Sequence, residues 1–175
     1  MNGADIVVRR LRLLGVERVF TLCGNGLDPF HAACDRAGME LIDVHNEQAA
    51  AYMADTHARL TKSIGVCAVS SGIAHANALT GVLNSYFDGS PVLLITGSSP
   101  LTNYGLGHFQ ELDQVALARP VCKYAERVER VDLVRHAVDE ACAAATSGRP
   151  GPVHLTIPVD VFEAEVDGNA SIGPS

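Results

Sequence analysis

A chain of 175 residues has room for one domain and is too short for two ordinary ones. Its 13 basic and 20 acidic residues give a formal net charge of −7, and no basic stripe stands out, so nucleic acid and anionic membranes are poor partners. Hydrophobic residues make up 47% and Trp is absent, so we expect an aliphatic core of the kind that parallel strands form under Ala-rich helices.

The first half of the chain alternates segments of helical period with short buried runs. In chain order we expect helix 4–14, strand 18–22, helix 28–37, strand 39–44, helix 47–61, strand 64–70 and helix 73–87. Asp28 and Asn46 are expected to cap the helices 28–37 and 47–61 at their starts, and Gly15 and Gly38 to end the helices 4–14 and 28–37.

The second half continues the alternation after the break at 88–90. The clearest central strand is 91–97 (PVLLITG), followed by a polar loop over 98–107. We then expect a short helix at 113–118, a strand at 121–128, a helix from Asp132 to Gly148 and a last strand at 152–157.

Strands separated by helices of this length predict repeated βαβ units. The expected fold is α/β: a single-domain, three-layer α/β/α sandwich with a mainly parallel sheet over residues 1–166, followed by a polar, disordered tail at 167–175. Ligands of such sheets bind beyond the carboxyl ends of the strands. The loops at that edge are expected to begin at Cys23, His45, Ser70, Gly97 and Val128.

Cysteine usage and hydropathy indicate a cytoplasmic protein. The five cysteines are scattered and form no CxxC pair, which argues against a zinc site or a disulfide framework and for reduced thiols. No segment approaches the ~20 apolar residues of a membrane span, and the N-terminus lacks a signal-peptide pattern. We expect no metal ligands in this chain.

Two generic motifs compete for the loops at the ligand edge. Gly24-Asn25-Gly26 follows a strand as a dinucleotide fingerprint does, but Pro29 stands where the third glycine belongs. The segment 68–72 (AVSSG) resembles a nucleophile elbow, but Ala68 replaces its first glycine. Plain strand-to-helix turns that need glycine explain both segments more simply.

Two further residues stand out at this edge. Glu47 opens an Ala-rich helix, where a carboxylate is favoured by the helix dipole and can also face a cofactor packed against the sheet. Phe109 is a large apolar residue in the polar segment 107–111 (GHFQE). It either faces a ligand or anchors the loop as a buried side chain.

Five stretches in a fixed order resemble one protein family. They cover most of the chain and read GVERVFTLCGNG, HNEQAAAYMADTHARLT, GVCAVSSGIAHANALTGVLNSYFDGSPVLLITG, GHFQELDQVALARPVCKYAERV and SGRPGPVHLTIPVDV. Together they resemble the N-terminal, pyrimidine-binding domain of thiamine diphosphate enzymes, on the acetohydroxyacid synthase and benzaldehyde lyase branch. The resemblance implies the thiamine diphosphate-binding fold.

The resemblance implies a catalytic role for Glu47. In the family, a glutamate at this position hydrogen-bonds N1′ of the cofactor's aminopyrimidine and favours the imino form of the 4′ nitrogen. That nitrogen removes the proton from C2 of the thiazolium ring, so that the cofactor attacks a 2-oxo acid or an aldehyde.

The resemblance also implies roles for the neighbouring loops. Further cofactor-binding positions are Cys23, Gly24, Asn25, Gly26, Ser70, Ile73 and Asn77. The segment SSGIAHAN departs from the family's TSGPGATN at Ile73 and Ala74. Phe109 and Gln110 match the family's FQ pair on the substrate side, and His108 beside them is expected to influence which carbonyl is accepted; Gln110 and His108 join Glu47 as catalytic candidates.

The family binds diphosphate and Mg²⁺ through a GDG…NN motif in a separate domain, and the 175 residues contain no such motif. We therefore expect a partner subunit that holds the diphosphate and Mg²⁺, in an α2β2 assembly, rather than an excised domain. The implied reaction is decarboxylation of a 2-oxo acid, carboligation of the product to a second carbonyl, or both. Acetolactate synthesis is the leading expectation. The alternatives are a sulfopyruvate- or phosphonopyruvate-type decarboxylase subunit and a non-catalytic binding module that retains the fold.

Overall fold

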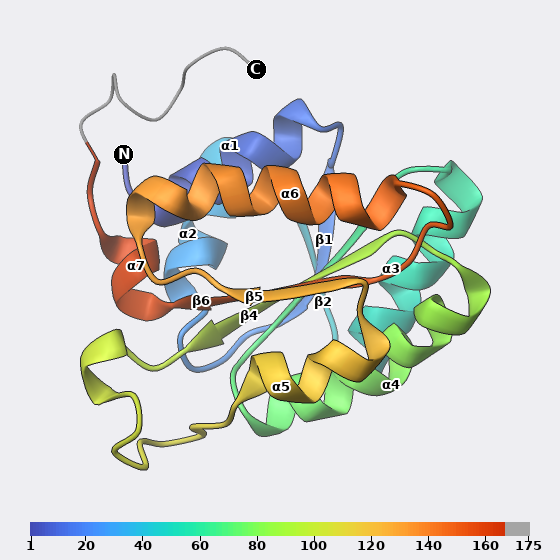
Figure 1. The fold of residues 1–175 in the computed structure, drawn as a ribbon. Helices are drawn as coiled ribbons and strands as arrows, with labels where there is room; N and C mark the ends of the chain where they lie inside the picture. Colours follow the sequence, from blue (N-terminus) through green and yellow to red (C-terminus); the bar gives the residue numbers. More distant parts are fainter. Residues whose placement is uncertain (167–175) are drawn as a thin grey trace.

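The computed structural model describes residues 1–166, which form one parallel sheet between two layers of helices (Figure 1). In these residues the strand order is β2-β1-β3-β4-β6-β5, and every pairing is parallel. The expected three-layer sandwich is confirmed, and the sheet is entirely parallel where the sequence predicted a mainly parallel one. The strands are β1 (Arg18–Leu22), β2 (Glu40–Asp43), β3 (Gly65–Val69), β4 (Val92–Ser98), β5 (Tyr124–Arg127) and β6 (Val153–Pro158).

The helices divide between the two faces of the sheet. One layer holds α1, α2, α6 and α7, and the other holds α3, α4 and α5 (Figure 1). Their bounds are α1 (Gly3–Leu13), α2 (Asp28–Ala37), α3 (Glu47–Thr61), α4 (Ile73–Asp88), α5 (Gln114–Ala118), α6 (Val134–Thr146) and α7 (Val159–Glu163). Three single 3₁₀ turns lie at 101–103, 119–121 and 131–133.

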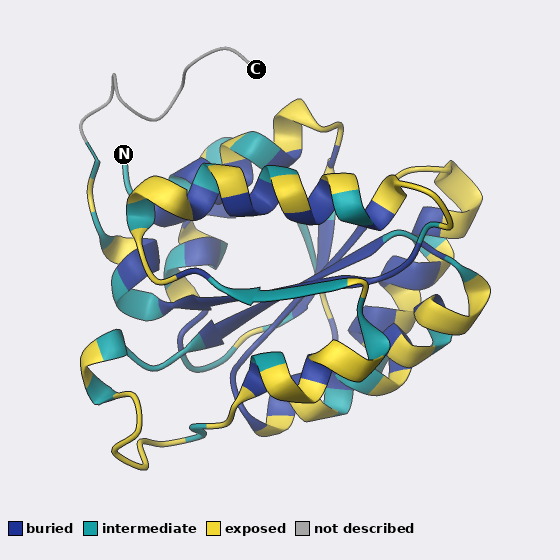
Figure 2. Cartoon of the chain, in the orientation of Figure 1, coloured by how far each residue is buried: buried dark blue, intermediate teal, exposed yellow. Residues whose placement is uncertain are grey.

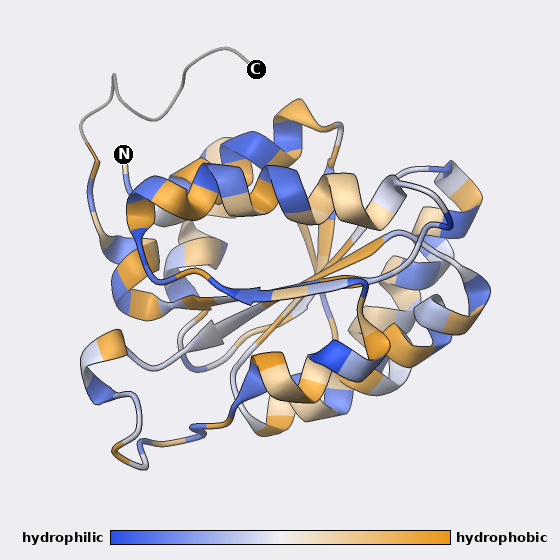
Figure 3. Ribbon diagram, in the orientation of Figure 1, coloured by the Kyte–Doolittle hydropathy of each residue, from blue (hydrophilic) through white to orange (hydrophobic). Residues whose placement is uncertain are grey.

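The strands in the middle of the sheet are buried on both faces, as Figure 2 shows in dark blue. Because successive side chains of a strand point to opposite faces, β3 serves two cores. Val66 and Ala68 pack with the α1 and α6 layer, whereas Cys67 and Val69 pack with α3 and α4. Figure 3 shows the same division as apolar strands and inner helix faces beneath hydrophilic outer surfaces.

Helix ends follow the expected chemistry in two cases and depart from it in one. Asn46 caps α3 by accepting a hydrogen bond from the backbone N of Gln48 at 2.8 Å, and Gly38 ends α2 with a left-handed φ of 64°. Asp28 was expected to cap α2, but that expectation is wrong. The cap position is Leu27, which makes no side-chain cap bond, and Asp28 is the first helical residue. The negative charge of Asp28 still suits this end of the helix dipole.

Several boundaries shift because short turns precede the regular elements. The helix expected from Asp132 begins as a 3₁₀ turn, and α6 starts at Val134. The strand expected over 121–128 is shortened to β5, because a second 3₁₀ turn occupies 119–121. Helix α7 was not anticipated, since five residues are too few to show a helical period in sequence.

The polar tail predicted at 167–175 lies outside the described residues, so the domain boundary at 166 stays a prediction. Among residues 1–166, no helix combines the length and the apolar character that crossing a bilayer requires.

The tight packing of α3 on α4 leaves no room for a side chain at Gly81. A Cβ added there would lie 2.6 Å from Ala51 Cβ and 2.8 Å from the backbone N of Tyr52. We expect Gly81→Ala to lower the free energy of unfolding by about 1–3 kcal/mol in chemical denaturation, because this overpacking outweighs the helix propensity gained.

The matched control is Gly151→Ala. A Cβ at Gly151 would meet only the flexible Lys123 side chain, at 2.9 Å and beyond. We expect its unfolding free energy to change by less than about 0.5 kcal/mol. Equal stability of the two variants would contradict the close packing of α3 on α4 at Gly81.

Candidate active site

The strand order places a ligand crevice between β1 and β3. The chain moves from β1 to β2 on one side and then crosses β1 to reach β3 and β4 on the other. In parallel sheets, ligands bind beyond the carboxyl ends of the strands at such a change of direction, and this edge is called the crevice below. The turns at 23–27 and 70–72 flank this point, as predicted from the loop positions.

The two turns contact each other through small residues. The Ser70 hydroxyl donates to the backbone O of Asn25 at 3.0 Å, and the Asn25 side-chain amide donates to Ser71 Oγ at 3.3 Å. A Cβ on Gly24 would lie 2.7 Å from Ser70 Cβ, so only glycine allows this approach. Gly26 has a φ of 79° and lies against the backbone of Ser98. The glycines of this turn therefore serve turn geometry and close packing beside the crevice.

Glu47 opens α3 beside this crevice and is half-buried. The Asn77 side-chain amide, from α4, donates to Glu47 Oε2 at 2.9 Å. Within residues 1–166, Oε1 has no hydrogen-bond partner. Burial, and secondarily the charge of Glu47, raise the pKa of the Cys67 thiol on β3, which places the carboxylate near the sheet. Asn77 thus fixes one carboxylate oxygen and leaves the other for a ligand.

Gln110 reaches the same crevice from the long loop after β4. Its Oε1 lies 3.3 Å from the Ser71 hydroxyl and 3.5 Å from that of Ser70. Its φ is 58°, a left-handed conformation that few residues other than glycine adopt. Such strained backbone is often found at functional sites, where the surrounding structure must hold it. The structure thus brings Gln110 together with Ser70 and Asn25.

The tip of the loop projects into solvent. Phe109 is 68% exposed, so the interpretation of Phe109 as a buried anchor is wrong. His108 Nδ1 lies 2.7 Å from Ser99 Oγ, and the backbone N of His108 donates to Glu111 Oε2 at 2.9 Å. In the described part of the chain, neither His108 nor Phe109 contacts Glu47.

Glu111 organises this tip, and sequence reasoning missed it. The carboxylate accepts from the backbone N of Gly105 and of His108, and these bonds lower the pKa of Glu111. No periodic signal marks such a residue, because a loop carries none.

Two other predicted cofactor positions lie at the surface. Ile73, the first residue of α4, is 73% exposed. Cys23 is also exposed, and its thiol donates to Asp28 Oδ1 at 3.6 Å. Their cofactor roles stay predictions, because neither residue contacts the cluster of Asn25, Ser70 and Gln110 in residues 1–166.

A buried polar network lies on the α4 and α5 side of the sheet, and sequence reasoning passed over most of it. His154 lies within β6. Its Nε2 lies 2.9 Å from Thr96 Oγ1 and 3.1 Å from Thr156 Oγ1, and its ring stacks on His75 at a centroid distance of 4.6 Å. The side-chain amide of Gln114, at the start of α5, donates to the same two hydroxyls. One sequence signal could have indicated this network: polar residues alternate with apolar ones in β6, at 154 and 156, and so lie on one face of the strand.

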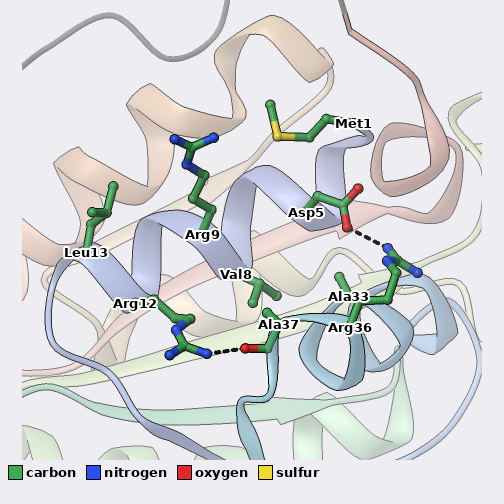
Figure 4. A pocket seen from close by; sticks show the side chains of 9 residues that line it. All are labelled: Met1, Asp5, Val8, Arg9, Arg12, Leu13, Ala33, Arg36 and Ala37. Carbon is green, nitrogen blue, oxygen red and sulfur yellow. Dashed lines mark hydrogen bonds and ion pairs between the residues drawn. The ribbon is translucent and has the colours of Figure 1, made fainter. Parts of the chain in front are cut away.

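A groove between α1 and α2, in the other helical layer, is the main alternative cavity (Figure 4). Its volume is about 540 Å³. Arg12 donates to the backbone O of Ala37, and Arg36 pairs with Asp5 at 2.5 Å, so two of its three arginines serve the packing of α1 on α2. None of the candidate residues lines this groove.

The fold and the crevice define a cofactor-binding α/β domain with its site at the direction change of a parallel sheet. Comparison with known families makes this specific. The family model described as "Thiamine pyrophosphate enzyme, N-terminal TPP binding domain" matches residues 1–117. This range includes Glu47, Asn77 and Gln110. The chain belongs to this family, and the predicted resemblance is confirmed.

Relatives that align over most of the chain include 2-hydroxyacyl-CoA lyases and acetolactate synthase large subunits. The chain is 42% identical to 2-hydroxyacyl-CoA lyase 2 of Caenorhabditis elegans and 39% identical to that of Homo sapiens, over 92% of its length in both cases. It is 36% identical to a probable acetolactate synthase large subunit of Methanocaldococcus jannaschii, over 95% of its length. The aligned region covers 25%, 26% and 28% of these relatives, so the chain spans about a quarter of their length.

The exposed Cys23 gives a chemical probe of the crevice. Partial burial, followed by the hydrogen bond and charge of Asp28, raises the pKa of the Cys23 thiol and reduces its thiolate fraction at a given pH. We expect iodoacetamide at pH 8 to label Cys23 before the other thiols but more slowly than free cysteine. Asp28→Asn should speed labelling by about 2- to 10-fold, the effect of up to one pKa unit.

Asp35→Asn, at an exposed position of the same helix, is the control and should leave the rate unchanged. Equal labelling rates in the Asp28→Asn variant and the unmodified chain would show that Asp28 does not set the reactivity of this thiol.

Proposed function

We propose that the chain is the pyrimidine-binding subunit of a two-chain thiamine diphosphate enzyme that decarboxylates a 2-oxo acid, ligates the product to a second carbonyl, or both, in the manner of acetolactate synthase. One observation carries this proposal. Glu47 presents one carboxylate oxygen to the crevice while Asn77 holds the other at 2.9 Å. A carboxylate held in this way suits a ligand with a ring nitrogen that carries or shares a proton.

The residues at the crevice fit an aminopyrimidine. Glu47 Oε1 would accept from N1′, and Asn77 would keep the carboxylate in the required orientation. The Gly24–Gly26 turn packs its backbone against Ser70 and Ser98, which fixes this turn beside the crevice. When bound, thiamine diphosphate supplies the electron sink of the reaction. The contribution of this chain is to orient the pyrimidine and to hold the proton at N1′.

Gln110 and His108 take the substrate side in this proposal. Gln110 presents an amide next to the hydroxyls of Ser70 and Ser71, and an amide can bind either a carboxylate or a carbonyl oxygen. Phe109 and His108 stand on the exposed tip, where they would line the approach of the substrate. This loop and the partner together would form the pocket whose shape selects the donor substrate and the acceptor substrate.

The second half of the site would come from a partner subunit that holds the diphosphate and Mg²⁺, in an α2β2 assembly. Large apolar side chains stand exposed on the outer sides of α3 and α4, which supports a protein partner on this layer. They are Tyr52, Met53, Leu60, Ile73, Leu83, Tyr86 and Phe87. A cytoplasmic location belongs to the same proposal and is supported by five thiols, none of them in a disulfide.

A second candidate reaction is cleavage of a 2-hydroxyacyl-CoA. The identity of 42% to a 2-hydroxyacyl-CoA lyase 2, against 36% to an acetolactate synthase large subunit, favours it. A screen of 2-oxo acids for CO₂ release, in parallel with 2-hydroxyacyl-CoA thioesters for aldehyde release, separates the two. None of the relatives named above is a sulfopyruvate- or phosphonopyruvate-type enzyme, and the held carboxylate of Glu47 argues against a purely non-catalytic module.

The role of Glu47 is tested by Glu47→Gln in the enzyme reconstituted with its partner. We expect the turnover rate to fall by about 10²–10⁴-fold, because the amide cannot share a proton with N1′ as a carboxylate does. Circular dichroism should show an unchanged fold. The control is Glu163→Gln, an exposed position on α7, which should keep its activity. Near-normal turnover by Glu47→Gln would refute the assignment.

The division of the cofactor between two chains is tested by titration calorimetry. We expect no measurable binding of thiamine diphosphate to this chain alone and clear binding after the partner and Mg²⁺ are added, because the diphosphate group would be held by the partner. Tight binding by the isolated chain would contradict the two-chain arrangement while leaving the role of Glu47 open to the preceding test.

A further inference from the structure

Gln114 joins three elements through one buried side chain. The residue is 1% exposed and begins α5. Its Oε1 accepts from the backbone N of Gly72 at 2.8 Å, at the start of α4. Its Nε2 donates to the backbone O of Gly97 at 3.2 Å, on β4, and it lies 3.0 Å from Thr96 Oγ1 and 3.1 Å from Thr156 Oγ1.

Two of these partners fix the orientation of the amide. A backbone carbonyl such as that of Gly97 can only accept a hydrogen bond, and the backbone N–H of Gly72 can only donate one. Gln114 must therefore turn its NH₂ to Gly97 and its oxygen to Gly72. The threonine hydroxyls rotate to suit. A side chain without both a donor and an acceptor would leave one of these buried backbone groups unpaired, which is unfavourable.

Gly72 in turn supports Gln110. A Cβ on Gly72 would lie 2.5 Å from the backbone O of Gln110, so the two backbones are in direct contact. Both residues have a left-handed φ, 59° at Gly72 and 58° at Gln110. Because Gln110 is not a glycine, its conformation must be held by its surroundings. The surface that holds it is the turn that Gln114 fixes.

We propose that Gln114 is a positioning residue for the substrate side of the site: by fixing Gly72, it holds Gln110 in its left-handed conformation with the side-chain oxygen beside Ser70 and Ser71. The role of Gln110 toward substrate rests on the proposed function, whereas the positioning itself concerns this chain alone. Gln114 also ends the loop that carries His108, Phe109 and Gln110, so the same side chain anchors that loop to the sheet.

The surroundings of Gln114 permit a test by pH. Thr96 and Thr156 connect it to His154, which stacks on His75. Burial lowers the pKa of His75 to about 4 and holds that of His154 well below its usual value, which favours the neutral form of both rings. Glu111 and Arg127 are the charged residues that line the small cavity beside Gln114. Glu111 is ionised between about pH 5 and 8 because its pKa is lowered.

The test is Gln114→Glu, which keeps the shape of the side chain. When protonated, the introduced carboxyl can donate to Gly97 O and accept from Gly72 N, as the amide does. When ionised, it places a negative oxygen against Gly97 O. Burial raises the pKa of such a carboxyl, so its ionisation is expected between pH 5 and 8. The readouts are the exchange protection of the Gly72 amide and the backbone chemical shifts of Gln110, both by NMR.

We expect the variant to match the unmodified chain at pH 5. At pH 8 its Gly72 protection should fall by about 10-fold or more, while the unmodified chain changes by less than about 2-fold and amides of β4 stay protected in both. The shifts of Gln110 should move with the same pH midpoint. A purely space-filling role of Gln114 would produce no such pH profile.

Gln114→Met provides a second variant, in which the loss of protection should be present at every pH. Leu117→Ala, at an exposed position of the same helix, is the control and should leave Gly72 and Gln110 unchanged. Unaltered Gly72 protection in both Gln114 variants would overturn the proposal, as would a loosened Gly72 with unmoved Gln110 shifts.

Kinetics of the reconstituted enzyme add an independent readout. Gln114→Met should raise KM for the carbonyl substrate by about 10-fold, the effect of one lost hydrogen-bonding interaction, with the affinity for thiamine diphosphate unchanged. Unchanged KM together with weakened cofactor binding would contradict a substrate-side role. Absence of turnover by the unmodified enzyme would count against the proposed function alone, because the NMR result on the chain still decides the positioning.

Discussion

The close approach of two turns, one after β1 and one after β3, is the constraint on which the site depends. Gly24 and Ser70 lie so near each other that a single added carbon would collide. The two turns can meet because β1 and β3 are neighbours in the sheet and point the same way. Glu47, Asn77 and Gln110 are each placed relative to that contact. A shift of either turn would therefore separate groups that the proposed chemistry needs together.

The side chains that face the crevice are held to different degrees. Glu47 begins α3 and Asn77 lies in the second turn of α4, and the contact of these two long helices tolerates only glycine at position 81. Gln110 comes from a loop of which the tip is exposed. Rigid elements hold functional groups more accurately than loops do. The proposed cofactor side is thus positioned by the fold, whereas the proposed substrate side needs dedicated contacts, and the bonds of Gln114 and Glu111 supply them.

Sequence predicted the fold well because its signals are periodic. Apolar runs marked the inner strands β1, β3, β4 and β6, and glycine and asparagine at the ends of α2 and α3 behaved as their backbone chemistry requires. The misplaced cap at Asp28 shows the limit of such rules, since the residue suits the helix dipole whether it caps the helix or begins it. The α7 helix was missed because five residues show no period.

The candidate site was predicted in part, and the reason is physical. Loop order at the strand ends placed Gly24, Glu47 and Ser70 at one edge, because all strands of a parallel sheet point the same way. Contacts such as Asn77 with Glu47 join residues 30 positions apart, and no local pattern reports them. Exposure of Phe109 was equally beyond a pattern, since a phenylalanine in a loop packs inward in one fold and stands outside in another.

The network of Gln114 is polar, whereas the core residues around it are aliphatic. Thr96, His154 and Thr156 occupy inward positions of two central strands, where their neighbours are leucine, isoleucine and valine. Aliphatic residues there would pack without unpaired polar atoms, and stability alone would favour them. The polar set is concentrated at the end of the sheet that carries the crevice, and its only amide makes the bond to Gly72. The backbone N–H of Gly72, a donor, and the backbone O of Gly97, an acceptor, orient the amide of this network. We therefore explain the network by the fixed geometry of Gln110 rather than by the stability of the core.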